Sequence, residues 1–158
     1  MLWDANPEEG LEREQVSPVN FMDWRGLPVL EDAAAWWRPE MNLVDGAGEP
    51  MRVPAVEASE NLFALLGVEP LLGDGFQRDS TLHGSEPEAV ISHRLWRSRF
   101  GGDPAVLGRS VRLNGFAYTI TGVMPMGGEA ADSPSADDRW SGVAVTMFVP
   151  NDALAETR

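Results

Sequence analysis

The 158-residue sequence predicts an α+β fold built from short helices and short antiparallel strands. Two observations predict this class. Several short segments carry apolar residues at helical spacing, begin near Ser, Asn or Asp, and end at Gly or Pro. Other segments alternate apolar and polar residues between turn residues, most clearly around Asn114-Gly115, where a tight hairpin is expected because both turn positions need positive φ.

The first 40 residues are expected to contain the end of a strand and two helices. Residues 1–3 resemble the last residues of a strand entering an acidic loop rather than a natural N-terminus. Ser17 is the expected cap of a helix starting at Pro18, because proline at the first helical position loses no hydrogen bond. Apolar residues of this helix share one stripe: Phe21, Trp24 and Leu27. A second short helix is predicted over Val29–Trp37 and is ended by Pro39.

The segment from residue 41 to residue 87 is expected to hold a strand pair and one helix. Residues 41–53 read "MNLVDGAGEPMRV", two apolar runs separated by turn residues, which predicts two strands. Ser59 or Asn61 is the expected cap of a short helix that ends at Gly67. A connector with turns at its glycines follows, and residues 77–87 are polar and expected to be exposed.

A strand and a well-delimited helix are predicted next. Residues 88–92 form a short apolar strand, and Ser92 can cap a helix over residues 93–100. Trp96 and Phe100 are spaced i, i+4 and therefore share a face of this helix. Gly101-Gly102 ends the helix, and Asp103 is expected to cap one further turn.

The hairpin is predicted within residues 111–123, and the chain then enters a long loop. Apolar residues alternate on both sides of the Asn114-Gly115 turn: Val111 and Leu113 before it, and Phe116, Tyr118 and Ile120 after it. Residues 126–142 are rich in Gly, Ala, Ser and Asp, which predicts a mobile loop. The last strand is expected from residue 143 and ends before Pro150, and no internal repeat is found.

Charge and composition exclude several classes of function. The 12 basic residues, all Arg, are outnumbered by 25 acidic ones, and the resulting net charge of −13 repels nucleic acids and anionic lipid surfaces. Cysteine is absent, which excludes disulfides and thiol chemistry. No run approaches the 18 or more apolar residues needed to cross a bilayer, and the acidic first 20 residues do not resemble a signal peptide, so the segment itself is expected to be soluble.

No residue pattern indicates catalysis, a metal site or a cofactor. The two imidazoles, His83 and His93, have no metal-ligand spacing around them. Ser92 is adjacent to His93, but neighbours on a helix do not face each other, so Ser92 is interpreted as a cap. The glycines of "LLGDGF" and "FGGDP" match neither a dinucleotide nor a phosphate loop, and the chain has no Lys for a Walker motif.

Carboxylate pairs and a tryptophan pair leave two alternatives open. Glu31-Asp32 and Asp137-Asp138 lie in polar stretches, whereas a glycosidase needs two carboxylates about 5 to 10 Å apart across a cleft. Adjacent residues on a helix cannot both face the core, so Trp36 or Trp37 is expected to reach the surface. That tryptophan is either the edge of the core or an anchor for a partner.

Four separated motifs carry a resemblance to a known family. They are "SPVNFMDWR" (17–25), "LFALLGVEPLLGDGF" (62–76), "AVISHRLWRSRFGGDPAVLGRSVRLNGFAYTITGVMP" (89–125) and "FVP" (148–150). In this order they resemble the MacB-like periplasmic core domain, in the version found in acidobacterial-type duplicated permeases of the FtsX-like ABC group. The resemblance covers most of residues 1–150.

The resemblance implies a noncatalytic domain of an inner-membrane permease, on the periplasmic face of the bacterial inner membrane. It implies a porter-like βαβ lobe with an inserted, mostly β lobe. Residues 1–35 would be the first porter piece, 40–147 the inserted lobe, and 148–158 the exit segment towards a second porter piece that this sequence lacks. The implied partners are the remainder of the permease, its cytoplasmic ATPase and a periplasmic adaptor or lipoprotein, in a dimeric parent.

Three further expectations follow. The missing porter piece would leave apolar surface around Phe21 and Trp24, which predicts weak stability or self-association of this segment. The competing function is a free-standing peptide- or polysaccharide-binding module that uses Trp36 or Trp37. An enzyme would require His93 or a carboxylate pair to line a closed pocket.

Overall fold

The computed structural model describes residues 4–6, 11–14, 18–34, 36–37, 39–46, 48–77, 87–125 and 143–146. The chain divides into two compact units, and each is described by itself. The first comprises Met1–Ala33 with Val149–Arg158, and the second is Ala34–Phe148.

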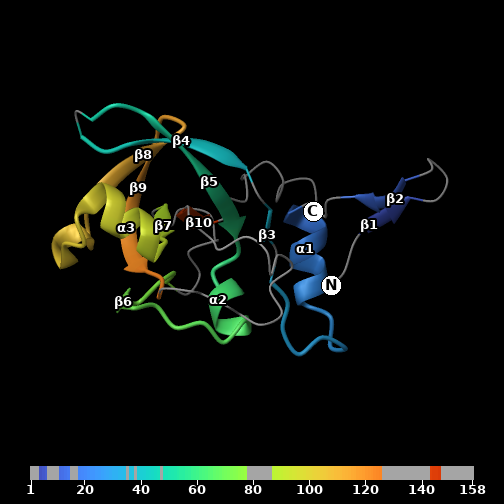
Figure 1. The fold of residues 1–158 in the computed structure, drawn as a ribbon. Coiled ribbons are helices and arrows are strands. Elements are labelled where there is room, and N and C mark those ends of the chain that lie inside the picture. Colours follow the sequence, from blue (N-terminus) through green and yellow to red (C-terminus); the bar gives the residue numbers. More distant parts are fainter. Residues whose placement is uncertain are drawn as a thin grey trace. The chain divides into compact units, whose positions relative to one another are not determined.

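The first unit contains a strand pair and one helix (Figure 1). Strands β1 (Asp4–Asn6) and β2 (Leu11–Glu14) pair antiparallel, and helix α1 spans Pro18–Arg25. The predicted helix start at Pro18 is confirmed, whereas residues 1–3 and Ser17, the expected cap, lie outside the described residues. The expected apolar stripe is only partly exposed, because Phe21 is buried and Trp24 is half-buried.

The helix predicted over Val29–Trp37 is wrong. Turns and bends occupy residues 26–31, and strand β3 (Trp36–Trp37) pairs antiparallel with β5 (Met51–Ala58), Trp36 opposite Ala58. Pairing with β5 satisfies the backbone of this segment, and this tertiary interaction overrides its helical propensity. Within this strand, the side chain of Trp36 is half-buried.

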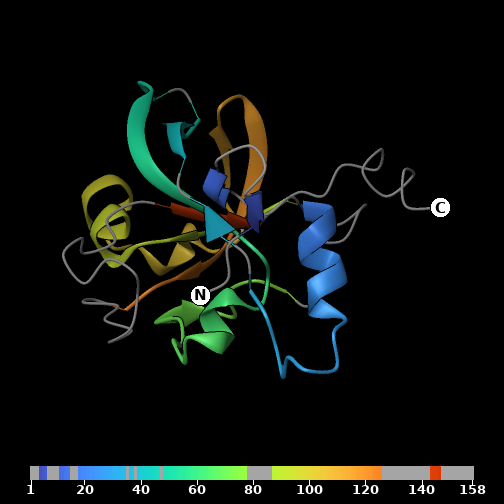
Figure 2. The same ribbon diagram turned by 90° about the vertical axis from the view of Figure 1, so that its right-hand side faces the viewer.

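The second unit is a curled sheet whose pairings close a ring (Figures 1 and 2). The order is β10-β7-β9-β8-β4-β5, and β5 also pairs with β10 in parallel. The β7–β9 pairing is parallel too, and the other pairings around the ring are antiparallel. The remaining ring strands have these bounds: β4 Glu40–Val44, β7 Glu88–Ile91, β8 Ser110–Leu113, β9 Phe116–Val123 and β10 Val143–Thr146. The α+β class is therefore confirmed.

The predicted hairpin is confirmed in its turn and register. Asn114 and Gly115 have φ values of 51° and 86°, and Leu113 pairs with Phe116 across the turn. Both central residues of a type I′ turn need positive φ, which Asn and Gly tolerate best. The predicted strand pair around Asp45 is also confirmed as β4 and β5, and their register places Met41 opposite Val53.

Helix α3 (His93–Phe100) has the ends that the sequence predicts. The Ser92 hydroxyl accepts a hydrogen bond from the Leu95 amide at 3.1 Å, and the helix ends at Gly101 with φ 65°. The Asp103 carboxylate accepts from the Ala105 amide at 2.9 Å and caps the short 3₁₀ helix Pro104–Val106. Local side-chain caps therefore determine where both helices begin.

The cap predicted for the preceding helix is confirmed in position but not in its hydrogen bond. Asn61 occupies the N-cap position of helix α2 (Leu62–Leu65), and its side chain makes no capping hydrogen bond. The Asn61 side-chain oxygen accepts a hydrogen bond from the Ser59 hydroxyl at 2.7 Å. Gly67, the predicted stop, has φ 69° and lies just after the helix.

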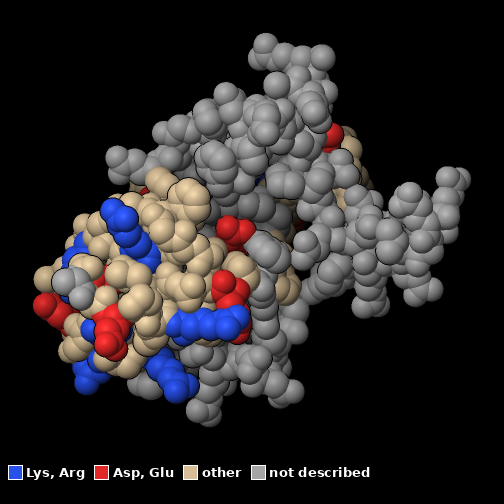
Figure 3. Space-filling model, turned by 90° about the horizontal axis from the view of Figure 1, so that it is seen from above, with Lys and Arg blue, Asp and Glu red and all other residues tan. Residues whose placement is uncertain are grey.

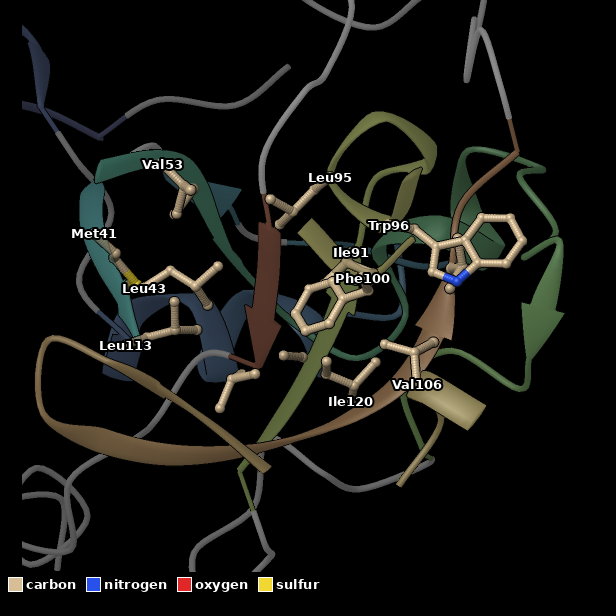
Figure 4. Packing of buried hydrophobic residues seen from close by; sticks show 14 residues of the cluster. Met41, Leu43, Val53, Ile91, Leu95, Trp96, Phe100, Val106, Leu113 and Ile120 are labelled. Carbon is tan, nitrogen blue, oxygen red and sulfur yellow. The ribbon is translucent and has the colours of Figure 1, made fainter. Parts of the chain in front are cut away.

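Two hydrophobic clusters hold the second unit together. The larger one joins α3 to the inner face of the ring (Figure 4), and its members are Met41, Leu43, Val53, Ala55, Ala89, Ile91, Leu95, Trp96, Phe100, Val106, Val111, Leu113, Ile120 and Val123. The smaller one consists of Val90 and Met124, with Phe63, Val68 and Phe76 packed against them. Strand β7 contributes Ala89 and Ile91 to the first cluster and Val90 to the second, so it is buried on both faces.

Candidate functional site

Among the residues that the structure describes, His93 and Ser92 make contacts within helix α3. His93 lies in the first turn of α3, where its ring meets the Trp96 ring edge-on with 5.5 Å between centroids. The hydroxyl of Ser92 is occupied as the α3 cap. His83 lies outside the described residues. Within the described ranges, no group of three or more His, Cys, Asp or Glu side chains could hold a metal ion.

The remaining motifs are structural where they are described. Gly73 and Gly75 both have φ 73°, as a turn interpretation requires. A Cβ at Gly73 would overlap the carbonyl oxygen of Thr121, so only glycine lets strand β6 (Leu72–Gly73) pair with β9. Glu31 and Asp32 are exposed, and the Asp32 carboxylate accepts from the neighbouring Ala33 amide at 2.8 Å. Asp137-Asp138 lies outside the described residues.

Helix α3 is tied to the sheet through polar contacts as well as through the core. The Arg99 guanidinium donates to Asp45 Oδ1 from Nε at 2.9 Å and from Nη2 at 2.6 Å, and Nη2 also donates to the Glu49 carbonyl at 2.9 Å. Both side chains of this ion pair are partly buried. The indole N–H of Trp96 donates to the Asp103 carbonyl at 2.9 Å. These contacts fix α3 to the β4–β5 turn and to the 3₁₀ helix.

The hairpin turn is tied to the neighbouring strand. The Asn114 amide donates to the Asn42 carbonyl at 3.0 Å, and the Asn114 side-chain oxygen accepts from the Asn42 amide at 2.9 Å. Phe116, directly after the turn, is 72% exposed. The predicted alternation therefore fails at the first residue of β9, because this part of the strand extends past the buried core.

Charged side chains are interspersed on the surface that Figure 3 shows. Arg94 and Arg97 are exposed on α3, and the Arg109 guanidinium lies over the Phe100 ring, 5.3 Å from its centroid. Acidic side chains separate the basic ones on this face of the described surface (Figure 3). The described residues on this face therefore form no continuous basic surface for nucleic acid, in line with the net charge of −13.

One cavity, which the sequence does not predict, lies beside α2. Its volume is about 420 Å³, and residues from 60 to 76 line it together with Met124 from the end of β9. Phe63 and Phe76 form its aromatic part, with ring centroids 5.5 Å apart. Three of its lining residues are carboxylates: Glu60, Glu69 and Asp74. The register of β6 on β9 brings Met124 to this segment, so no spacing in the sequence signals the cavity.

Comparison with known proteins assigns the chain to a family. The sequence model of the MacB-like periplasmic core domain matches residues 5–156. The chain belongs to this family. The resemblance inferred from the four motifs is thus confirmed, and MacB-like periplasmic core domains are parts of ABC transporter permeases rather than catalytic domains. The comparison with curated proteins gave no significant match.

Solved structures share the fold of this MacB-like domain. The periplasmic region of MacB from Actinobacillus actinomycetemcomitans is 12% identical with a TM-score of 0.64, and the match covers 98% of this chain and 78% of that one. The extracellular domain of the noncanonic ABC-type transporter YknZ from Gram-positive bacteria is 16% identical with a TM-score of 0.58, and the match covers 89% and 80%. At these identities, the likeness establishes the fold.

The family places the domain outside the inner membrane, as a periplasmic or extracellular part of an ABC permease. Membrane-embedded permease segments and an ATPase are accordingly its class of partner. Of the helices in the described ranges, none has the length and hydropathy required to cross a bilayer.

Proposed function

We propose that this MacB-like domain is noncatalytic and couples the transport cycle of its permease to the movement of a substrate or partner. The observation that carries the proposal is the match of residues 5–156 to the periplasmic core domain family. A domain that transmits motion must keep its shape while its surroundings move. The second unit has long-range contacts that support such rigidity.

Rigidity of the second unit is supported by contacts that join distant parts of the chain. The ring of strands closes through the parallel pairing of β10 with β5. The Arg99–Asp45 ion pair joins residues 54 positions apart, and the Asn42–Asn114 bond joins residues 72 positions apart. With α3 also packed into the larger cluster, relative motion of these elements would break several contacts at once.

The domain assignment and the partners are part of the proposal. Residues 1–35 act as the first porter piece, 40–147 as the inserted lobe and 148–158 as the exit segment. The remainder of a dimeric permease, its cytoplasmic ATPase and a periplasmic adaptor or lipoprotein are the partners. A free-standing peptide- or polysaccharide-binding module has less support, because Trp36 is half-buried on a strand paired to β5.

Hydrogen exchange in the parent permease, reconstituted with its ATPase, tests the coupling. Exchange is compared between the nucleotide-free state and a state trapped with a nonhydrolysable ATP analogue. We expect nucleotide-dependent exchange around the boundary between Ala33 and Ala34, and unchanged protection in β8 and β9. Identical exchange over residues 1–158 in both states would show that the domain is not coupled to the ATPase.

A further inference from the structure

The cavity beside α2 has the volume of a small-molecule site and is partly open to solvent. Its volume of about 420 Å³ lies in the range of about 300 to 1,000 Å³ typical of such sites. Its walls come from α2, from the connector that follows it and from Met124. The buried Gly75 lies close to Gly122 of β9, where a Cβ on Gly122 would be 3.1 Å from the Gly75 backbone, so this wall is held tightly against the sheet.

The apolar part of the cavity is continuous with the smaller hydrophobic cluster. Phe63, Val68 and Phe76 pack against Val90 and Met124, yet all three are only half-buried. The two phenyl rings are tilted by 39° with their centroids 5.5 Å apart. Partly exposed aromatic faces of this kind attract both apolar groups and cations.

The part of the cavity lining that the structure describes carries charge of one sign. Three carboxylates belong to it, and no Arg or His is among these described lining residues. Glu69 and Asp74 are exposed, and within the part of the chain that the structure describes neither takes part in an ion pair or a hydrogen bond. An organic anion would meet these carboxylates unfavourably, whereas a cation would be attracted both by them and by the phenyl faces.

We propose that this cavity binds a small organic ammonium ion with an apolar body. The body fits against Phe63, Phe76 and Met124, and the ammonium group lies towards Glu69 and Asp74. This inference is independent of the proposed coupling, because binding is measured on the chain alone. A failure of either proposal therefore leaves the other standing.

Binding is tested by NMR titration of the 158-residue chain with three probes of similar size. These are benzyltrimethylammonium, the neutral N,N-dimethylbenzamide and the anion phenylacetate. We expect saturable shifts of amide signals in residues 62–76 and at Met124 with benzyltrimethylammonium. The cation should bind about 5-fold more tightly than the neutral probe, because it gains cation–π and carboxylate contacts that are exposed to solvent. Phenylacetate should not bind in the cavity.

A charge-matched pair of variants shows whether the cavity carboxylates contribute to cation binding. Glu69→Gln with Asp74→Asn removes two carboxylates from the cavity, and Glu31→Gln with Glu49→Gln removes two exposed carboxylates elsewhere. We expect the first variant to weaken cation binding about 3- to 10-fold and to reduce its salt dependence, and the second to have little effect. Amide spectra report whether each variant is folded.

Several results would overturn the proposal. They are an absence of saturable shifts, shifts that map away from residues 62–76, equal affinity for the cation and the neutral amide, or equal affinities of the two charge-matched variants. Equal affinity for the neutral probe would reassign the cavity to apolar ligands in general.

Discussion

Replacement of Arg99 tests whether α3 is fixed to the sheet as the structure indicates. Its guanidinium makes two hydrogen bonds to Asp45 and one to the Glu49 carbonyl, and the side chains of Arg99 and Asp45 are 24% and 16% exposed. Arg52 and Glu40 form a second ion pair in the same unit, with side chains 73% and 60% exposed. The second pair is a natural control for the first.

The two pairs should differ in coupling energy. Hydrogen bonds to charged groups contribute about 1.5 to 3 kcal/mol to stability. Because the Arg99–Asp45 pair is partly exposed to solvent, which weakens ion pairs, its coupling energy should lie near the lower end, at about 1.5 kcal/mol. The exposed Arg52–Glu40 pair should contribute no more than about 0.5 kcal/mol. Arg99→Ala alone should cost about 2 kcal/mol, because it also leaves the partly buried Asp45 carboxylate without its guanidinium.

Double-mutant cycles measure these energies. For each pair, urea unfolding is measured on the unsubstituted chain, the two single alanine variants and the double variant. Tryptophan fluorescence and circular dichroism follow the unfolding at about 0.1 M and 1 M NaCl. The Arg99–Asp45 coupling should persist at high salt, and the Arg52–Glu40 coupling should vanish. If both couplings are equal, or if the Arg99–Asp45 coupling is lost at high salt, α3 is not held by a shielded ion pair.

Three further predictions concern the hairpin, the core and pH. Asn114→Gly tolerates the positive φ but loses the acceptor for the Asn42 amide, and it should lower the free energy of unfolding in urea by about 1 kcal/mol. Asn114→Ala loses the same acceptor and is also strained at positive φ, so it should cost about 2 kcal/mol. Equal costs would contradict the turn geometry. Leu43→Ala, at a fully buried position, should cost about 3 kcal/mol, and a cost below about 1 kcal/mol would contradict the assigned core. Burial, and secondarily the charge of Glu57, raise the pKa of Tyr118 above 10.0. The stability that this shift represents is complete below the unfolded-state pKa and falls as the pH rises through the folded-state pKa. Tyr118 is the only tyrosine, so ultraviolet titration should show one ionisation, with a midpoint above 10.0 that Glu57→Gln lowers; a midpoint at or below 10.0 would contradict the burial.

Elements with strong local signals could be predicted from the sequence. Ser92 and Gly101 delimit α3 because a hydroxyl cap and a left-handed glycine act on their own helix ends. Asn114-Gly115 likewise determines the hairpin, since the turn type depends on two adjacent residues. Such signals need no information from distant parts of the chain.

Elements that depend on distant partners could not be predicted in this way. Trp36-Trp37 is a strand because β5 pairs with it, and nothing within residues 29–37 signals that partner. The ring closes through β10 and β5, which are about 90 residues apart in sequence and whose register no local pattern specifies. The cavity depends on the same kind of contact, because the pairing of β6 with β9 brings Met124 to Phe63 and Phe76.

Fluorescence energy transfer in the reconstituted parent permease tests the coupling most directly. This chain has no cysteine of its own, so dyes attach only at chosen exposed positions once any cysteines elsewhere in the permease are replaced. One pair, Asp23→Cys with Arg112→Cys, joins the two units, and the control pair, Arg94→Cys with Arg112→Cys, lies within the second unit. We predict that ATP changes the transfer efficiency of the first pair and leaves the control pair unchanged. Constant efficiency for both pairs throughout the ATP cycle would contradict the proposal that the transport cycle moves the rigid second unit relative to the first.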